Sequence, residues 1–393
     1  MTDSDILNDI LLACLENDRG FTDVIIHEGY PIIAQSPAGN APLPSMRSGD
    51  VRKVTHEDLQ TFAGTVHAMS LPNPAQERDK NWNDVALTRL DRGAIKEAID
   101  WDLERNGEAV TTRLRFTIVK SGGGKQLAAV VRHIPQTIPS LPDIDFPHPA
   151  NQLLKGSGLV LLTGPTKNGK STTAAAMLKH IRDTRPGHIV TIEDPIEYAL
   201  PHSNDGSCLV TSREVGSDVS SYLEGAEDAL RMNPTVIMIG EIRDEATARA
   251  ALTLGESGHL VISTMQSTTV EGALFKLWAL TANHAGAQAS IASCLRGVVR
   301  TALIPTKDRL RYATAYEFMI NQGDFATVIA KGNSNDANPA RQIRALLDGS
   351  RPILGRSLNL SLMDLIKDKK ITPETARECS NDLADFNKLN TAT

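Results

Sequence analysis

Residues 164–171 read GPTKNGKS and fit the pattern G-x-x-x-x-G-K-[ST]. An apolar run precedes this loop, and an alanine-rich segment follows it. In such a loop the glycines let backbone N–H groups curl around an anion, and the next helix directs its positive end at that anion. The pattern therefore predicts a site for the phosphates of a nucleotide. The residues of this phosphate loop are Gly164, Pro165, Thr166, Lys167, Asn168, Gly169, Lys170 and Ser171, followed by Thr172.

The residue types in the phosphate loop suggest a part for each side chain. We expect the Lys170 ammonium to reach the β- and γ-phosphates and the Ser171 hydroxyl to hold Mg²⁺. Thr172 can contact the α-phosphate. The sequence therefore predicts ATP and Mg²⁺ as cofactors. The alternative is a chance match in a glycine-containing loop, which a preceding strand and a following helix disfavour.

An acidic turn follows the next apolar run along the chain and contains Glu193, Asp194 and Glu197. Carboxylates at the point where a parallel strand leaves its sheet lie on the ligand side of such folds. One of the three could orient or deprotonate a water molecule that attacks the γ-phosphate. The alternative is a solvated acidic turn capped by Pro195.

Another apolar run ends at Gly240 and Glu241. A strand-end acid beside a phosphate loop is the usual second anchor for Mg²⁺, so Glu241 is the candidate for that position. The same residues could also begin a helix with Asp244 near its N-cap, and the two interpretations are compatible.

A polar cluster flanks the apolar run in GHLVISTMQS (258–267). His259 precedes the run, and Thr264, Gln266 and Ser267 lie at its end or just after it. Polar groups at the end of a central strand can sense whether a γ-phosphate is present. His259 is a candidate for this work, although a lone histidine is more often a structural residue.

Three arginines lie on or next to predicted strands far from the phosphate loop in the sequence: Arg113, Arg115 and Arg132. Surface ion pairs are the default interpretation of such residues. Phosphoryl transfer, however, often recruits an arginine from a neighbouring subunit to stabilise charge on the γ-phosphate.

The chain divides by pattern into an α+β domain over 1–134, a linker over 135–150 and an α/β domain over 151–393. Five prolines at 135–149 predict an extended, fairly stiff linker. Beyond it, fully apolar runs alternate with helical stretches, which predicts a parallel sheet covered on both faces. A helical cap is expected over about 335–393. The predicted helices before the linker are 5–17, 56–69 and 93–107, and the predicted strands are 22–29, 113–120, 127–134, 158–164, 188–194, 235–241 and 259–265.

Composition narrows the possible partners and location. The 393 residues carry a net charge of −6, without the basic surplus that nucleic-acid binding usually requires, so sequence-specific nucleic-acid binding is not expected. The four cysteines lie far apart, which argues against a zinc site or a disulfide framework. The N-terminus lacks a basic region typical of a secretory signal, and no apolar stretch is long enough to span a membrane. We therefore expect a cytoplasmic protein with at most a peripheral membrane role.

Four motifs in one order resemble those of the secretion ATPases, the motors of type II secretion, type IV secretion and type IV pili. Residues 164–172, 191–198, 236–244 and 258–267 are similar to the Walker A, Asp box, Walker B and His box of that family. The chain most resembles the pilus-retraction ATPases and the related motors of type IVB secretion and conjugation. The resemblance covers most of the chain and is weakest over 70–112.

The resemblance implies an N-terminal PAS-like domain joined by a linker to a RecA-like ATPase domain. It implies a ring of six copies, docked on secretion or pilus machinery at the inner membrane. Glu193 would be the catalytic carboxylate and Glu241 the Walker B acid. Arginines 113, 115 and 132 occupy positions from which the family supplies arginines to the nucleotide, partly between subunits.

Two departures from the family pattern keep other functions open. The family usually has Gly-Ser where this chain has Lys167-Asn168, and a second histidine where this chain has Gln266. Gln266 can form hydrogen bonds but cannot take up a proton. The absence of a four-cysteine zinc motif argues against the type II secretion branch. The leading interpretation is an ATP-hydrolysing motor; the alternatives are a nucleic-acid motor of the RecA or helicase class and a non-hydrolysing nucleotide switch.

Overall fold

The computed structural model shows two compact units. They comprise Met1–Gln136 with Asp308–Arg311, and Thr137–Lys307 with Tyr312–Thr393. The helix expected over 5–17 lies outside the described residues, apart from Ile10. The structure describes residues 10, 23–36, 39–43, 50–70, 81–105, 108–134, 137–283, 286–332, 338–349 and 353–391.

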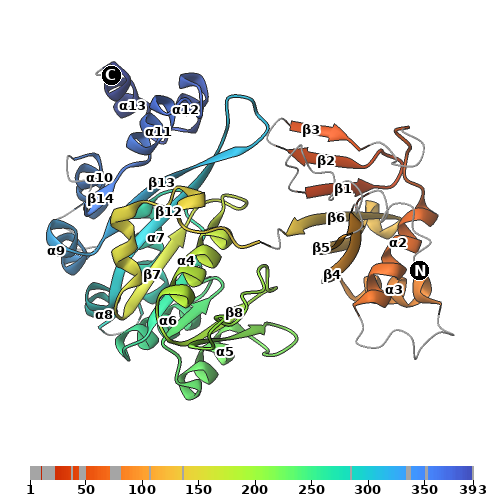
Figure 1. The fold of residues 1–393 in the computed structure, drawn as a ribbon, viewed down its shortest axis with the longest axis horizontal. Helices are drawn as coiled ribbons and strands as arrows, with labels where there is room; N and C mark the ends of the chain where they lie inside the picture. The colour runs from red at the N-terminus through yellow and green to blue at the C-terminus, as the bar shows by residue number, and fades with distance from the viewer. Residues whose placement is uncertain are drawn as a thin grey trace. The chain divides into compact units, whose positions relative to one another are not determined.

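The first unit is a six-stranded antiparallel sheet, and helices α2 and α3 lie on one of its faces (Figure 1). Its strand order is β3-β2-β1-β6-β5-β4. The helix expected over 56–69 is confirmed, because Thr55 and Asp58 form a capping box that fixes its start. The strands expected over 22–29, 113–120 and 127–134 are also confirmed. The elements are β1 (Asp23–His27), β2 (Ile33–Ser36), β3 (Gly39–Pro42), α2 (His56–Met69), α3 (Trp82–Arg92), β4 (Ile95–Arg105), β5 (Glu108–Ser121) and β6 (Gln126–Ile134).

The helix predicted over 93–107 is wrong, because this segment is strand β4. It pairs with β5 along its whole length, from Ile95 opposite Ile118 to Arg105 opposite Glu108. The sequence misleads because apolar residues four positions apart, such as Ile95 and Ile99, share one face of a helix and also one face of a strand. Tertiary pairing decides between the two.

The second unit is built on an eight-stranded sheet of order β14-β13-β12-β7-β11-β10-β8-β9. The run from β12 to β9 is parallel, and β13 and β14 pair antiparallel at one edge. The four apolar runs predicted as parallel strands are β7, β11, β10 and β8, which is confirmed. The strands are β7 (Gly158–Thr163), β8 (Gly187–Glu193), β9 (Cys208–Glu214), β10 (Val236–Ile239), β11 (Leu260–Met265), β12 (Leu295–Pro305), β13 (Tyr312–Ile320) and β14 (Gly355–Arg356).

Helices cover both faces of this sheet, as predicted. Helix α4 packs on one face, and α5 to α10 pack on the other. The expected C-terminal helices are present, and α11 to α13 pack against the β12–β13 pair. The helices are α4 (Lys170–Thr184), α5 (Tyr222–Ala229), α6 (Glu245–Glu256), α7 (Val270–Thr281), α8 (Ala287–Cys294), α9 (Gly323–Lys331), α10 (Pro339–Asp348), α11 (Leu358–Lys367), α12 (Pro373–Cys379) and α13 (Leu383–Thr391).

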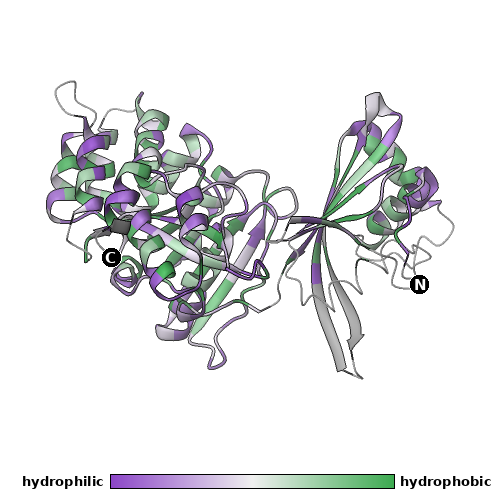
Figure 2. Ribbon diagram, turned by 90° about the horizontal axis from the view of Figure 1, so that it is seen from above, coloured by the Kyte–Doolittle hydropathy of each residue, from purple (hydrophilic) through white to green (hydrophobic). Residues whose placement is uncertain are grey.

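Hydrophilic and hydrophobic residues both occur along the helices (Figure 2), which fits helices with one face on a sheet and the other in water. Within the described ranges, no helix is both long and apolar enough to cross a membrane.

The extended linker expected over 135–150 is not what the structure shows from residue 137 onward. This segment forms two short 3₁₀ helices, Pro142–Ile144 and His148–Leu154, that pack on the second unit. Lys179 donates a hydrogen bond to the Ile138 carbonyl (2.8 Å). Pro142 and Pro149 occupy the first two positions of these 3₁₀ helices, where a missing N–H costs little, and the apolar side chains of Ile138, Leu141 and Phe146 are buried. The limits of the domains themselves remain a prediction.

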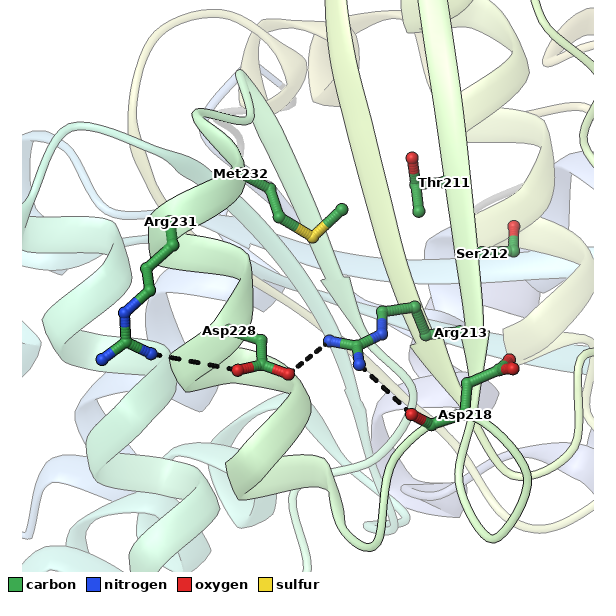
Figure 3. A pocket seen from close by; sticks show the side chains of 7 residues that line it. All are labelled: Thr211, Ser212, Arg213, Asp218, Asp228, Arg231 and Met232. Carbon is green, nitrogen blue, oxygen red and sulfur yellow. Dashed lines mark hydrogen bonds and ion pairs between the residues drawn. The ribbon is translucent and has the colours of Figure 1, made fainter.

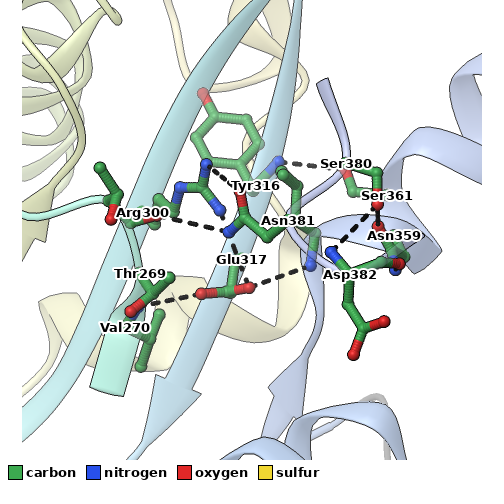
Figure 4. Close-up of polar contacts among 12 residues, drawn as sticks. Thr269, Val270, Arg300, Tyr316, Glu317, Asn359, Ser361, Ser380, Asn381 and Asp382 are labelled. Atoms are coloured by element: carbon green, nitrogen blue, oxygen red, sulfur yellow. Dashed lines mark hydrogen bonds and ion pairs between the residues drawn. The ribbon is translucent and has the colours of Figure 1, made fainter. Parts of the chain in front are cut away.

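A fully buried carboxylate on β13 joins several elements of the second unit (Figure 4). Glu317 accepts hydrogen bonds from the backbone N–H of Val270 (2.9 Å) and of Leu358 (3.2 Å), the first residues of α7 and α11. Arg344 of α10 donates to the same carboxylate (3.0 Å) and to Glu271 (2.6 Å). Burial lowers the pKa of Arg344, but the two carboxylates outweigh burial and raise its pKa above the ordinary value.

We predict that Glu317→Gln destabilises the second unit by about 3–5 kcal/mol, because it leaves the buried Arg300 and the partly buried Arg344 with less opposing charge. The measurement is urea unfolding followed by Trp278 fluorescence, in a chain whose other tryptophans, Trp82 and Trp101, are changed to phenylalanine.

The control for this prediction is Asp364→Asn. It breaks the ion pair between Arg356 and a carboxylate that is 59% exposed, and it should cost no more than about 1 kcal/mol. Equal unfolding midpoints for the two variants would contradict the central role of Glu317.

Candidate functional site

The phosphate loop has the backbone geometry that its sequence predicts. Gly164 has φ 146° and Gly169 has φ 79°, both in the region that favours glycine. A Cβ added at Gly164 would lie 2.7 Å from the carbonyl oxygen of Thr301, so no larger residue fits. Helix α4 begins directly after this loop, and no side chain caps its N-terminus. Its first backbone N–H groups are thus left for another acceptor, as in an anion site.

The side chain of Lys170 folds back over the phosphate loop. Its ammonium donates hydrogen bonds to the carbonyl oxygens of Gly164 (2.9 Å) and Pro165 (2.8 Å). Burial lowers the pKa of Lys170, while the charges of Glu241 and Glu197 act in the opposite direction. The two acidic residues therefore share an electrostatic environment with the loop lysine.

The two unusual loop residues, Lys167 and Asn168, have distinct structural parts. Lys167 has φ 64°, a left-handed conformation that is uncommon outside glycine. The Asn168 amide donates to the Thr166 carbonyl (3.2 Å), and its oxygen accepts from the N–H of Leu303 on β12 (3.1 Å). Asn168 therefore ties the phosphate loop to the neighbouring strand.

Glu193 ends β8 and is partly buried. Burial raises its pKa to about 7, and the nearby charges of Glu197 and Glu214 add to this effect. A carboxylate with a pKa near neutrality is suited to accept a proton from water. Glu214 lies opposite Glu193 on β9 and accepts a hydrogen bond from the N–H of Ile196 (3.0 Å), which fixes the acidic turn. Glu214 could not be predicted from the sequence, because only the strand register places it beside Glu193.

Tyr198 is a second supporting residue that the sequence analysis did not single out. Its hydroxyl lies 2.9 Å from that of Thr172 in the first turn of α4. The pair connects the end of the acidic turn to the phosphate loop, so the two predicted parts of the site are in direct contact.

Glu241 follows β10 and lies at the same edge of the sheet. Arg243 contacts one of its carboxylate oxygens through two nitrogens, each at 2.8 Å. The Thr264 hydroxyl donates to the Gly240 carbonyl (2.7 Å), which fixes the backbone before Glu241. A hydroxyl from Ser171 and a carboxylate from Glu241 are oxygen donors of the kind that Mg²⁺ uses together with nucleotide phosphates. The residues present therefore fit this cation.

The end of β11 lies beside the phosphate loop. The hydroxyl of Thr163, the last residue of β7, donates to the carbonyl oxygens of Met265 (3.0 Å) and Ser267 (3.2 Å). This brings Gln266 and Ser267 to the start of the loop. We call residues 266–269, between β11 and α7, the sensor loop.

The prediction that His259 belongs to this site is wrong within one chain, because the structure does not bring His259 to the phosphate loop. His259 precedes β11, whereas Gln266 follows it, so the six-residue strand separates them by about 20 Å. Its Nδ1 lies 3.1 Å from the Leu254 carbonyl, and its own carbonyl accepts from the Gly158 N–H (2.9 Å). Within one chain, His259 therefore joins α6 to the start of β7 and has a structural role.

The three predicted arginines belong to the first unit, whereas the phosphate loop belongs to the second. Arg115 on β5 lies opposite Arg132 on β6, and Arg113 shares their face of the sheet, opposite α2 and α3. Arg132 pairs with the buried Asp23 (3.0 Å). The structure gathers the arginines on one surface and leaves their relation to the nucleotide a prediction.

A hollow of about 600 Å³ lies against the edge strand β9 and contains none of the predicted site residues (Figure 3). The charged side chains that line the hollow form ion pairs with one another. Arg213 contacts Asp228 at 2.7 Å and donates to the Asp218 carbonyl at 3.2 Å. The hollow is therefore an ion-paired surface rather than part of the phosphate site.

The parallel sheet, the phosphate loop after β7 and the acids at the ends of β8 and β10 define a RecA-like P-loop ATPase. The chain belongs to the family described as "Type II/IV secretion system protein", which it matches over residues 142–343. It is 33% identical over 379 residues to "Type IV pilus ATPase PilU" of Pseudomonas aeruginosa, covering 95% of this chain and 89% of that protein.

Two solved structures share the fold over nearly the whole chain. One is the pilus retraction motor PilT with bound ADP, at TM-score 0.71 and 26% identity, covering 99% of both chains. The other is the ATPase DotB of Legionella pneumophila, at TM-score 0.76 and 22% identity, covering 96% of both chains. The family and fold inferred from the motifs are confirmed.

The raised pKa of Glu193 predicts a pH-dependent stability without nucleotide. The pKa of Glu193 is about 7 in the native state and near 4.5 in the unfolded chain. Its contribution to the free energy of unfolding is therefore fully present below pH 4.5 and is lost as the pH rises through 7. Glu193→Gln, which is always neutral, should match wild type at pH 4.5 and be more stable by up to about 3 kcal/mol at pH 8.

Urea unfolding at a series of pH values measures this difference, with the exposed Glu227→Gln as the control. A Glu193→Gln difference that stays constant between pH 4.5 and 8 would show that the pKa of Glu193 is not raised as described above.

Proposed function

We propose that the chain is an ATP-hydrolysing motor that powers a type IV secretion or conjugation system or a type IV pilus. Two features carry this proposal: the uncapped helix N-terminus behind the phosphate loop, and Glu193, whose pKa is about 7. Glu193 begins the acidic turn that ends at Tyr198, which contacts Thr172. The first feature suits phosphate binding, and the second suits removal of a proton from water.

In the proposed mechanism, the phosphate loop and Lys170 bind the phosphates of ATP. Ser171 and Glu241 would hold Mg²⁺, which supplies positive charge to the phosphate oxygens. Glu193 orients the attacking water and accepts one of its protons, so that the γ-phosphoryl group leaves as inorganic phosphate and ADP remains. Gln266 on the sensor loop would contact the γ-phosphate as a neutral hydrogen-bonding group.

We propose that the working unit is a ring of six copies, with Arg113, Arg115 and Arg132 reaching the nucleotide partly across subunits. Hydrolysis would rotate the two units relative to each other and move a partner complex. The proposed location is the cytoplasmic face of the inner membrane, where the partners are secretion or pilus machinery. The names of the pilus relatives and their coverage of this chain support this choice.

Two other functions remain alternatives to the motor. A nucleic-acid motor of the RecA or helicase class shares the fold, but the net charge of −6 gives it little support. A non-hydrolysing switch is motivated by Lys167 and Gln266. Stimulation of phosphate release by single-stranded DNA would favour the first alternative, and tight ATP binding without release would favour the second.

The motor predicts phosphate release that rises more than proportionally with protein concentration, because the site is completed between subunits. Glu193→Gln should lower turnover at least about 100-fold, since it removes the proton acceptor, while ATP binding is retained. His259→Gln is the matched control and should keep turnover within about threefold, because His259 lies at the far end of β11. Equal losses in the two variants would contradict the assigned role of Glu193.

A further inference from the structure

The sensor loop is bound from the sheet and from the C-terminal segment, in addition to the hydrogen bond that Lys276 of α7 donates to the Gln266 carbonyl (3.4 Å). On the sheet side, the Thr163 hydroxyl binds its backbone at Ser267, and Glu317 accepts from the N–H of Val270 directly after it. On the other side, the side-chain amide of Asn381 donates to the Thr268 carbonyl (3.4 Å). This second support comes from the C-terminal helices, because Asn381 lies 113 residues after Thr268 in the chain.

The oxygen of Asn381 is bound by a buried arginine of the sheet (Figure 4). Arg300 on β12 is only 5% exposed, lies opposite Thr163 on one side and Glu317 on the other, and donates to the Asn381 oxygen (3.2 Å). Its Nη1 lies 4.0 Å from the Glu317 carboxylate. Among the described residues, Nε and Nη1 of Arg300 have no hydrogen-bond partner. Asn381 is thus one of few acceptors for a guanidinium that burial makes costly to leave unpaired.

The C-terminal helices, rather than the sheet, determine where Asn381 lies. Asn381 sits between α12 and α13, and its neighbours are bound to α11. The Ser380 hydroxyl donates to the Asn359 oxygen (2.7 Å), and the Asn359 amide donates to the Asp382 carbonyl (2.9 Å). A shift of these helices therefore changes the support of the sensor loop.

We propose that Asn381 is a positioning residue for nucleotide turnover. Its side-chain oxygen accepts a hydrogen bond from Arg300, and its amide donates to the Thr268 carbonyl. These two bonds set the position of the sensor loop relative to the γ-phosphate. The C-terminal helices thereby act on the nucleotide site through one side chain. This inference rests on the proposed function, because the γ-phosphate is the group that the sensor loop would contact.

The test compares Asn381→Ala and Asn381→Asp with wild type. Alanine removes both hydrogen bonds, whereas aspartate keeps an acceptor for Arg300 and cannot donate to the Thr268 carbonyl. We expect both variants to lower kcat and the affinity for a non-hydrolysable ATP analogue by about threefold to tenfold, the effect of one lost hydrogen bond. ADP affinity should equal that of wild type in both variants, because ADP lacks the γ-phosphate. Thermal stability should equal that of wild type in Asn381→Asp, which keeps the acceptor for Arg300, and fall in Asn381→Ala, which removes it.

The control is Gln288→Ala in the same unit. It removes an exposed hydrogen bond of another side-chain amide, which Gln288 donates to the Ala330 carbonyl. Wild-type kcat and analogue affinity in Asn381→Asp would overturn the proposal, as would a parallel loss of ADP affinity in that variant. If wild type releases no phosphate, the proposed hydrolysis fails, and the ratio of analogue to ADP affinity still decides the role of Asn381.

Discussion

The arrangement of the second unit depends on the contacts of the buried Glu317 carboxylate with two helix N-termini and Arg344. A charge removed from water is costly unless hydrogen bonds and opposite charge surround it. Two helix N-termini and Arg344 provide both, because backbone N–H groups at the start of a helix carry partial positive charge. The result is that α7, α10 and α11 share one fixed point on the sheet. The sensor loop ends at that point, so its position follows from the same carboxylate.

The antiparallel pair β12–β13 supports both loops that would surround a γ-phosphate. The phosphate loop rests on β12, because the N–H of Leu303 donates to the Asn168 oxygen and the carbonyl of Thr301 leaves no room for a Cβ at Gly164. The sensor loop depends on the same pair through Glu317 and, by way of Asn381, Arg300. A parallel sheet alone would place the loops at one edge. The added antiparallel pair fixes their distance from each other.

Much of the fold could be predicted from sequence because its signals are local. The capping box at Thr55 marks the start of α2, and continuous apolar runs mark the parallel strands. The prediction failed where local pattern is ambiguous. The four-residue spacing in β4 suits a helix or a strand, and the prolines at 137–149 suit an extended linker or packed 3₁₀ turns. Long-range pairing with β5 and burial against α4 decided these two cases.

The sequence by itself determined the phosphate loop and the identity of the acids beside it. Glycine spacing sets the backbone conformation over eight residues, and no distant contact is needed to predict it. Only the tertiary structure decided which of the predicted groups meet. Strand length placed His259 at the far end of β11, register placed Glu214 next to Glu193, and burial raised the pKa of Glu193 to about 7. Pairing and desolvation depend on residues far apart in the chain, so neither can be deduced from spacing alone.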